Sequence, residues 1–326
     1  MKKIRSSQKS AAQEIDTFIH ASFLLDEMAT IIPEARKSGL ECIVLKGAAL
    51  HISGLLPDGN RPMTDVDLLV HEDDHQRWRG FFASYNYEPL PGSTSSFIKH
   101  GPTSLVFDLH TGLRFLDQRC LEQAWREQKT HIWADETFYL LPPEINLLYL
   151  TLHMTITHGY AERKWLNDLD TVIRFHQDSI DWEMVLDLAY RNHAFAPLAA
   201  TLHYLQRTRG TPIPVSILVS LNRNGSLFIK QLFSSSLSLP HGLPWFDYFA
   251  PFLIQPSPLQ FVIIGLRKLF PPLTFMKQRY NTSSSITAVL WYPVRLLRLG
   301  GKLGVSAMLA LIIMSLKRLF RMLRSR

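Results

Sequence analysis

The sequence has few cysteines and few charged residues for its length. Cys42 and Cys120 are the only thiols among 326 residues, which excludes a disulfide-stabilised scaffold and a four-cysteine zinc site. Charged residues make up 19% of the chain and hydrophobic residues 46%. Such a chain is too apolar for a disordered protein and is expected to bury much of its surface. The basic residues 1–10 are not followed by an apolar segment, so we expect no signal peptide and a cytoplasmic location.

Acidic residues are absent beyond Asp247. Residues 248–326 contain twelve Lys and Arg, a charge of +12, whereas the remaining 23 basic and 28 acidic residues leave residues 1–247 at −5. The total of +7 therefore describes neither part. The basic end also has few aromatic residues between its charges, so stacking on bases is poorly supported. The overall charge is thus no evidence for a nucleic-acid partner.

Hydrophobic periodicity divides the chain into three expected parts, residues 1–141, 142–240 and 241–326. Strands are expected in the first part at 42–45, 65–70 and 103–110. Helices are expected there at 11–39, 48–55 and 74–85. The second part has a helical period almost throughout, and beyond it we expect a Pro-rich loop at 236–260 and a helix at 259–269. The fold class is therefore α+β: a small mixed sheet with flanking helices, a helical subdomain and a basic helical tail.

The most informative segment is Arg61-Pro-Met-Thr-Asp65-Val-Asp67-Leu-Leu-Val. On a strand, Asp65 and Asp67 are two residues apart, so both carboxylates leave the same face while Val66 and Leu68 point into the core. Two neighbouring carboxylates repel each other unless a cation lies between them. Oxygen ligands at that spacing suit Mg²⁺ or Mn²⁺, which predicts a metal site of the kind used in nucleotidyl or phosphoryl transfer.

A third carboxylate is expected from another strand. Asp108 is a lone acid in the segment Phe107-Asp108-Leu109-His110, where Phe107 and Leu109 lie on the opposite face. His110 shares the face of Asp108, either as a packing side chain or as part of the site. Asp65, Asp67 and Asp108 are therefore the candidate catalytic residues and metal ligands.

A metal–triphosphate site also needs donors for the phosphates. Leu45-Lys46-Gly47-Ala-Ala-Leu combines a strand end, a cation, a glycine that permits close backbone approach and a following helix. Arg61, just before the carboxylate strand, would add a second cation. Lys46, Gly47 and Arg61 are therefore the candidate nucleotide-binding residues.

The order of these motifs resembles that of the polymerase-beta-like nucleotidyltransferase superfamily. The segments around Lys46-Gly47, Asp65-Val-Asp67 and Asp108-Leu-His110 are similar to a bacterial nucleotidyltransferase-like family found near polysaccharide- and peptide-modification genes. The resemblance covers roughly residues 15–240 and includes Leu152-His153 and Trp165-Leu166-x-Asp168-Leu169 in the helical part. Most of the superfamily has Gly-Ser where this chain has Lys46-Gly47, and Asp65 follows Gly47 by 18 residues, which is longer than usual.

The resemblance implies a metal-dependent transfer of a nucleoside monophosphate from a nucleoside triphosphate (NTP) to a hydroxyl of a non-nucleic-acid acceptor. The acceptor would be a small molecule, a saccharide or a peptide, and the cofactor would be Mg²⁺ or Mn²⁺. By the same resemblance, Asp65 and Asp67 bind the metal and Asp108 acts as the third carboxylate toward the incoming nucleophile. Lys46 and Gly47 contact the phosphates of the nucleotide.

Two other functions stay open. Asp-x-Asp also marks metal-dependent glycosyltransferases, in which it holds a nucleotide sugar. Only 64 residues precede Asp65, however, and glycosyltransferases usually place a nucleotide-binding half before the motif. The other alternative is a catalytically degenerate fold that serves as a binding module at a membrane. The presence of all three acids argues against it, because an inactive site is free to lose its metal ligands.

The helical part offers weaker signals. His153 and His158 are five residues apart, which is not the i, i+4 spacing that lets two histidines share a metal on an α-helix. We therefore expect them to be core or surface side chains. Lys164 and Asp168 have the i, i+4 spacing of a helical ion pair, and Trp165 is expected in the core.

The basic end contains 14 residues without a charge, 303–316, between Lys302 and Lys317. A helix that spans a bilayer needs about 20 apolar residues, so this segment favours a helix lying in the membrane interface. The basic residues after it suit an anionic lipid surface. We therefore expect a cytoplasmic protein with a peripheral position at the inner membrane face. The alternative is that residues 286–326 pack on the body as an ordinary helix.

Overall fold

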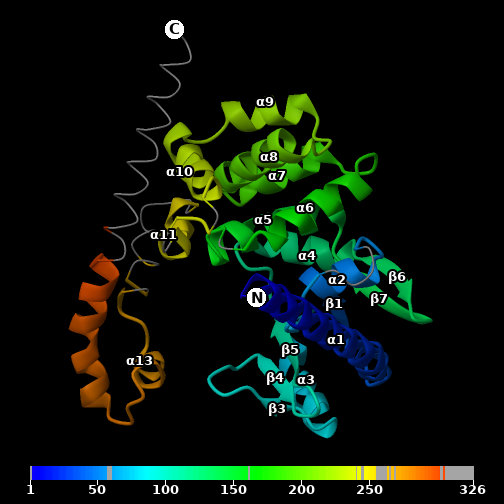
Figure 1. Ribbon diagram of the computed structural model, residues 1–326, viewed down its shortest axis with the longest axis vertical. Coiled ribbons are helices and arrows are strands. Elements are labelled where there is room, and N and C mark those ends of the chain that lie inside the picture. The colour runs from blue at the N-terminus through cyan, green and yellow to red at the C-terminus, as the bar shows by residue number, and fades with distance from the viewer. Residues whose placement is uncertain are drawn as a thin grey trace. The chain divides into compact units, whose positions relative to one another are not determined.

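The structure is a computed structural model that describes residues 2–56, 61–160, 162–239, 241–243, 246–254, 263, 266–267, 269–301 and 304. The chain forms two units, Met1–Asn146 and Leu147–Arg326 (Figure 1). The first contains the sheet, and the described elements of the second are all helices, as expected for an α+β fold. The finer division, with boundaries after residues 141 and 240, stays a prediction.

The first unit is built on a seven-stranded mixed sheet with the strand order β3-β4-β5-β2-β1-β7-β6. Its strands are β1 (Cys42–Val44), β2 (Val66–Val70), β3 (Glu88–Pro89), β4 (Ser96–Lys99), β5 (Leu105–His110), β6 (Lys129–Trp133) and β7 (Glu136–Leu140). Strand β2 runs parallel to β5 and antiparallel to β1. The three strands expected from the sequence are therefore the three adjacent strands at the centre of the sheet.

The hairpin β6–β7 was not predicted, and its turn explains why. Trp133 pairs with Glu136, so only Ala134 and Asp135 connect the two strands. Both connecting residues have positive φ, 49° and 61°, as a type I′ turn requires. Such turns are usually recognised by Asn-Gly or Asp-Gly. Ala-Asp carries no such signal, because its two residues rarely adopt this conformation.

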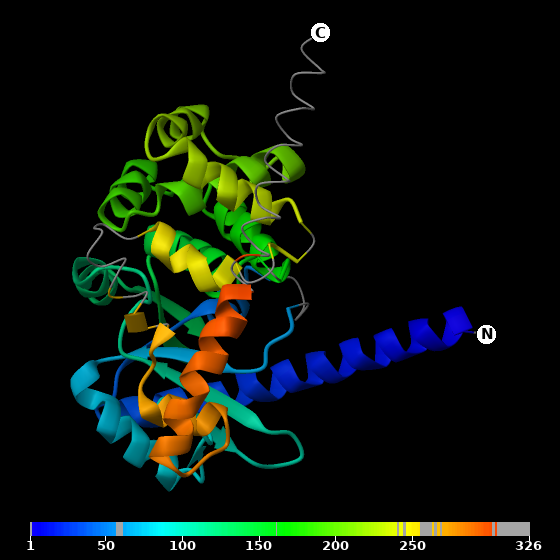
Figure 2. The ribbon, with the colours of Figure 1, turned by 90° about the vertical axis from the view of Figure 1, so that its left-hand side faces the viewer.

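Helices α1 (Lys2–Lys37) and α3 (His75–Ser84) contribute to the hydrophobic core of this unit. The core includes Val66 and Leu68 of β2 and Phe107 of β5, which confirms the side of the strand that the alternation predicted. Phe82 of α3 lies at its centre, with its ring centroid 5.1 Å from that of Phe97 and 5.5 Å from that of Phe107. Figure 2 shows α1 as one long helix whose N-terminal part extends past the sheet. The opposite face of β2 and β5 carries Asp67, Asp108 and His110 together with the apolar residues Leu69 and Val106.

Both thiols lie in the interior of this unit, since Cys42 and Cys120 are buried. Burial raises the pKa of the Cys42 thiol to about 12, and only the thiolate reacts with disulfide reagents. We expect a chromogenic disulfide at pH 8 to titrate almost no thiol in the folded chain and two per chain in guanidinium chloride. Rapid reaction of either thiol before unfolding would contradict the burial.

The remaining helices of the first unit are α2 (Lys46–Ile52), the short 3-10 helix η2 (Glu72–Asp74) and α4 (Gln118–Arg126). Helix α5 (Pro143–Leu152) spans the boundary between the units. The described helices of the second unit are η3 (His153–Thr157), α6 (Lys164–Phe175), α7 (Trp182–Arg191), α8 (Phe195–Arg209), α9 (Val215–Arg223), α10 (Leu227–Leu237), α11 (Phe246–Leu253), α13 (Leu273–Arg279) and a helix over 285–301. Helix α8 packs against α9 and α10.

One expectation for the elements of this unit is wrong. The segment 236–260 was expected to be a loop, but α10 extends to Leu237 and residues Phe246–Leu253 form α11. Their aromatic and apolar side chains explain the helix, because Phe246 is fully buried against Phe233 and Tyr160. Pro251 lies inside this short helix, which is why proline content alone misled the prediction. Most of the helix expected at 259–269 lies outside the described residues.

Two side-chain contacts in the helical part also differ from those expected from the sequence. The segment η3 is a π-helix, whose wider turn brings residues five apart into contact. The Nε2 atoms of His153 and His158 are consequently 3.1 Å apart, although an α-helix would separate them. Lys164 pairs with Glu162 at 2.6 Å rather than with Asp168. Trp165 is buried, as expected.

Candidate active site

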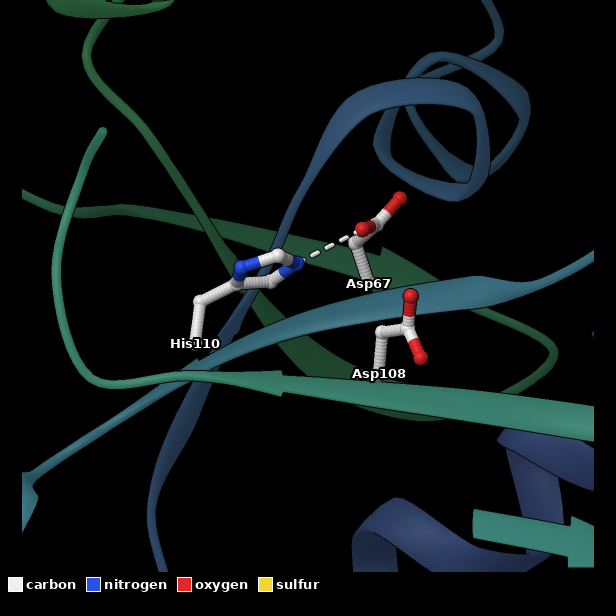
Figure 3. A group of neighbouring side chains, drawn as sticks. All are labelled: Asp67, Asp108 and His110. Carbon is white, nitrogen blue, oxygen red and sulfur yellow. Dashed lines mark hydrogen bonds and ion pairs between the residues drawn. The ribbon is translucent and has the colours of Figure 1, made fainter. Parts of the chain in front are cut away.

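The carboxylates of Asp67 and Asp108 lie side by side on neighbouring strands. The parallel pairing of β2 and β5 places Asp67 opposite Asp108 and Leu69 opposite His110. Because alternate residues share a face, the side chains of Asp67, Asp108 and His110 leave the sheet together (Figure 3). One ligand atom from each lies within 4.8 Å of the other two. The structure therefore joins two of the three predicted ligands and adds a histidine.

Asp67 is the electrostatic centre of the cluster. Its side chain is buried, and one oxygen, Oδ1, accepts a hydrogen bond from Lys46 Nζ at 2.6 Å and another from His110 Nε2 at 2.7 Å. Burial would raise the pKa of Asp67, but the hydrogen bond from His110 and the charge of Lys46 outweigh it and lower the pKa to about 2. The carboxylate is thus held ionised in the interior, ready to bind a cation.

Asp65 lies just before β2 and is only partly exposed. Burial raises its pKa, and so do the negative charges of Asp67 and Asp108. The three acids are therefore close enough to repel one another, which is the condition that a bound cation would relieve. Asp65 is not a member of the cluster of three ligand atoms, however, so its role as a ligand stays a prediction.

Lys46 points at a carboxylate in this structure. It begins α2 directly after β1 and has a φ of 51°, a left-handed conformation that residues with a side chain rarely adopt. The turn directs its ammonium group to Asp67, where the two side chains are 10% and 7% exposed. A phosphate contact by Lys46 stays a prediction, and in this structure its charge compensates that of Asp67.

Gly47 lies against the guanidinium group of Arg61, which is itself buried. A Cβ atom at position 47 would lie 2.1 Å from Arg61 Nη1, so only glycine permits this approach. His51 of α2 contacts the carbonyl oxygen of Arg61 through Nε2 at 3.0 Å. The two segments predicted to bind the nucleotide are therefore packed on each other beside the carboxylates.

Replacing Gly47 by Ala tests this packing. We expect nucleotide affinity to fall at least about 10-fold, because the new methyl group displaces the Arg61 guanidinium group. The melting temperature should change little, since the displaced atoms are the end of a flexible side chain. Gly80→Ala on α3 is the matched control, because a Cβ there meets nothing within 4 Å. Equal nucleotide affinity in both variants, measured by calorimetric titration, would show that Gly47 is not part of the nucleotide-binding site.

A cavity of about 530 Å³ adjoins the cluster at His110. Its walls come from the chain after β2, from the end of β5 and from the turn before β4. No sequence signal marked this cavity, because three segments separated along the chain form it. Of the two alternatives that the sequence left open for His110, the structure favours a place in the site, on the same face as Asp108.

The donor set of the cluster fits a hard divalent cation. Carboxylate oxygens suit Mg²⁺ and Mn²⁺, whereas an imidazole nitrogen suits softer metals. Asp67 and Asp108 therefore fit as ligands, and His110 fits as the hydrogen-bond partner that orients Asp67. Two ligands on one Mg²⁺ are at most about 4.2 Å apart, and the ligand atoms of Asp67 and Asp108 lie within 4.8 Å of each other, so small side-chain rotations would bring the two carboxylates into one coordination shell.

The chain belongs to the family of uncharacterised nucleotidyltransferases, whose family model matches residues 4–210. No curated protein matches the chain significantly. Among solved structures, the chain is similar to the crystal structure of an antigenic nucleotidyltransferase-like protein from Paracoccidioides brasiliensis. That match has 16% sequence identity and a TM-score of 0.40, and covers 62% of this chain and 97% of the other. The family match includes Lys46, Asp67, Asp108 and His110, so the cluster lies within the part of the chain that defines the family.

Proposed function

We propose that the protein is a metal-dependent nucleotidyltransferase that transfers a nucleoside monophosphate from an NTP to a hydroxyl of a non-nucleic-acid acceptor. The observation that carries the proposal is the pairing of Asp67 with Asp108 across β2 and β5, inside a chain of the nucleotidyltransferase family. The family match also favours nucleotidyl transfer over the glycosyl transfer that Asp-x-Asp alone would allow. The part of the chain that holds the site, residues 1–247, carries a charge of −5, which disfavours a polyanionic acceptor.

Each residue then has a defined task. Asp65, Asp67 and Asp108 would hold Mg²⁺ or Mn²⁺, and Lys46, Gly47 and Arg61 would bind the triphosphate. When bound, a divalent cation would neutralise the phosphates and favour ionisation of the attacking hydroxyl. The ammonium group of Lys46, which pairs with Asp67 here, would then be available to a phosphate oxygen. His110 keeps the Asp67 carboxylate in place through its hydrogen bond.

The proposal is tested by the binding of a non-hydrolysable triphosphate to the full chain, measured by calorimetry with Mg²⁺ and again with an excess of chelator. We expect binding with Mg²⁺ and its loss without the cation. Binding that ignores Mg²⁺ would contradict a metal-dependent site. Absence of binding under both conditions would favour the degenerate binding module instead.

We also propose that the C-terminal region holds the protein on an anionic membrane surface. Ile286, Val289, Leu290 and Leu297 of helix 285–301 are 76%, 50%, 68% and 79% exposed, and their spacing places them on one face. Among the described helices, none combines the length and the apolar character that crossing a bilayer requires. The apolar segment 303–316 lies outside the described residues, apart from Gly304. Basic residues from Arg295 onward, with no acids among them, supply the attraction to lipid.

Co-sedimentation with vesicles tests this second proposal. The full chain should pellet with vesicles that contain phosphatidylglycerol and stay in solution with pure phosphatidylcholine. Replacing Ile286, Leu290 and Leu297 together by Gln should abolish pelleting, whereas Val219→Gln, an exposed apolar residue of α9, should not. Equal behaviour of the two variants would place the contact elsewhere.

A further inference from the structure

We propose that the cavity beside His110 binds the acceptor, and that the acceptor is a neutral polyhydroxyl compound, a sugar or a polyol. This inference rests on the proposed nucleotidyl transfer and adds the chemical class of the second substrate. Three observations carry it: the place of the cavity in the sheet, the chemistry of its walls, and the exposed side chains of Gln76, Thr94 and Thr111, which make no hydrogen bond within the described part of the chain. A volume of about 530 Å³ lies within the roughly 300–1,000 Å³ typical of small-molecule pockets.

The cavity and the predicted phosphate donors lie toward opposite edges of the sheet. Lys46 follows β1, on one side of the strand that carries Asp67. The cavity lies at the end of β5, on the other side of that strand, and extends to the turn before β4. Lys46 and His110 accordingly reach the same oxygen, Asp67 Oδ1, from the two sides. His110 is also part of the cavity wall.

This arrangement matches the geometry of the reaction. In nucleotidyl transfer the attacking and leaving oxygens lie roughly in line on opposite sides of the phosphorus atom. A triphosphate bound on the Lys46 side of the carboxylates leaves the cavity side open to the attacking oxygen. A small acceptor held in the cavity would therefore present its hydroxyl to the α-phosphate beside Asp108.

The walls of the cavity suit hydroxyl groups rather than phosphates. Thr94, Ser95 and Thr111 contribute hydroxyls and Gln76 contributes an amide. None of the described residues that line the cavity is Lys or Arg; Glu72 adds a carboxylate, and His75 and His110 add imidazole groups. A phosphate-rich acceptor thus finds no Lys or Arg here, whereas sugar and polyol hydroxyls can both donate to and accept from the groups of the walls.

The polar side chains of the walls are available to a ligand. Within the described part of the chain, the hydroxyls of Thr94 and Thr111 and the amide of Gln76 are exposed and make no hydrogen bond to another protein group. The turn that carries Thr94 is nevertheless ordered, because Ser93 Oγ accepts hydrogen bonds from the backbone nitrogens of Ser95 and Ser96 at 3.2 and 3.0 Å. The open cavity thus has an ordered turn on one side and exposed donors and acceptors that a ligand can take up without breaking contacts within the protein.

The proposed reaction is a nucleophilic displacement at the α-phosphorus of the NTP. The acceptor oxygen forms a bond to the α-phosphorus, and the bond between that phosphorus and the oxygen bridging to the β-phosphorus breaks. Pyrophosphate leaves with the electron pair of the broken bond. The hydroxyl proton passes to water at the open side of the cavity. The product is a phosphodiester between the acceptor and the nucleoside.

Saturation-transfer NMR on the full chain with Mg²⁺ and a non-hydrolysable triphosphate tests the inference. The probes are a panel of methyl glycosides and alditols, compared with sugar phosphates and a short oligonucleotide. We expect signals from the neutral polyhydroxyl probes alone. The double variant Thr94→Val/Thr111→Val should weaken their binding about 10-fold or more, because two hydrogen bonds are lost. Thr130→Val on β6, which is exposed and does not line the cavity, should bind as the wild type does.

The outcomes separate the two proposals. If the wild type binds triphosphate with Mg²⁺ but no glycoside or alditol, the acceptor class is wrong and the proposed function stands. Preferential binding of the oligonucleotide or of the sugar phosphates would also overturn the acceptor class. Equal glycoside binding by the Thr94/Thr111 variant and by Thr130→Val would place the acceptor outside the cavity. Failure of the wild type to bind triphosphate would overturn the proposed function itself.

Discussion

Replacing Asp67 by Asn is expected to abolish nucleotidyl transfer, with a fall in rate of about 1,000-fold or more. Asp67 is the buried carboxylate that faces Asp108 across β2 and β5. An amide cannot neutralise a divalent cation, so both metal affinity and the alignment of the triphosphate should be lost. The measurement is release of pyrophosphate from an NTP with Mg²⁺, in the presence of the acceptor once it is identified and of water as acceptor before that.

Asp67→Asn also leaves Lys46 beside a neutral group, so the variant can lose stability. Asp108→Asn provides the second test, because it leaves the pair of Lys46 and Asp67 intact and should also lose at least about 100-fold. Asp73→Asn, an exposed acid of η2, is the control that should keep full activity. Wild-type activity in Asp108→Asn would contradict a metal site shared by the two strands.

Replacing Lys46 by Met is expected to destabilise the chain by about 3–5 kcal/mol in the absence of a divalent cation. Lys46 and Asp67 form a nearly buried pair with 2.6 Å between Nζ and Oδ1, and removing one partner leaves a buried charge uncompensated. The free energy of unfolding is measured by urea denaturation. Lys129→Met on β6, an exposed position, should change it by less than about 0.5 kcal/mol.

The same variant gives a second, more diagnostic result. If a cation can bind Asp67, Mg²⁺ replaces the lost positive charge, so Mg²⁺ should raise the melting temperature of Lys46→Met more than that of the wild type. The nucleotide affinity of the variant should still fall, because the ammonium group is lost to the phosphates. An unchanged free energy of unfolding in Lys46→Met would contradict the proposal that a metal ion takes the place of Lys46 at Asp67. So would an equal effect of Mg²⁺ on the melting temperatures of the variant and the wild type.

The central strands and the carboxylates were predictable because their signals are local. Apolar runs locate β1, β2 and β5, and the two-residue period of a strand places Asp67 and Asp108 opposite the core residues Leu68 and Phe107. What the period cannot give is which strands are neighbours. The sequence predicts the third carboxylate on another strand but not which strands are neighbours, and the structure supplies the pairing of β2 with β5.

The rest of the site depends on contacts between distant segments. Lys46 was predicted to face phosphates, but the conformation of its backbone directs it to Asp67, 21 residues further along the chain. His110 was left open as a packing residue or a site residue because its partner lies on another strand. The cavity that it lines is formed by three separate segments. In the second unit, the contact of His153 with His158 depends on a π-helix, which the period of the sequence does not reveal.

The most direct test of the account is a crystal structure of the full chain with Mn²⁺ and a non-hydrolysable triphosphate, with the metal located by its anomalous scattering. We expect Mn²⁺ bonded to carboxylate oxygens of Asp65, Asp67 and Asp108 and to the triphosphate, with Lys46 turned from Asp67 to a phosphate oxygen. The cavity beside His110 should then open onto the α-phosphate. A metal bound away from Asp67 and Asp108, or a triphosphate bound while Lys46 still holds Asp67, would contradict it.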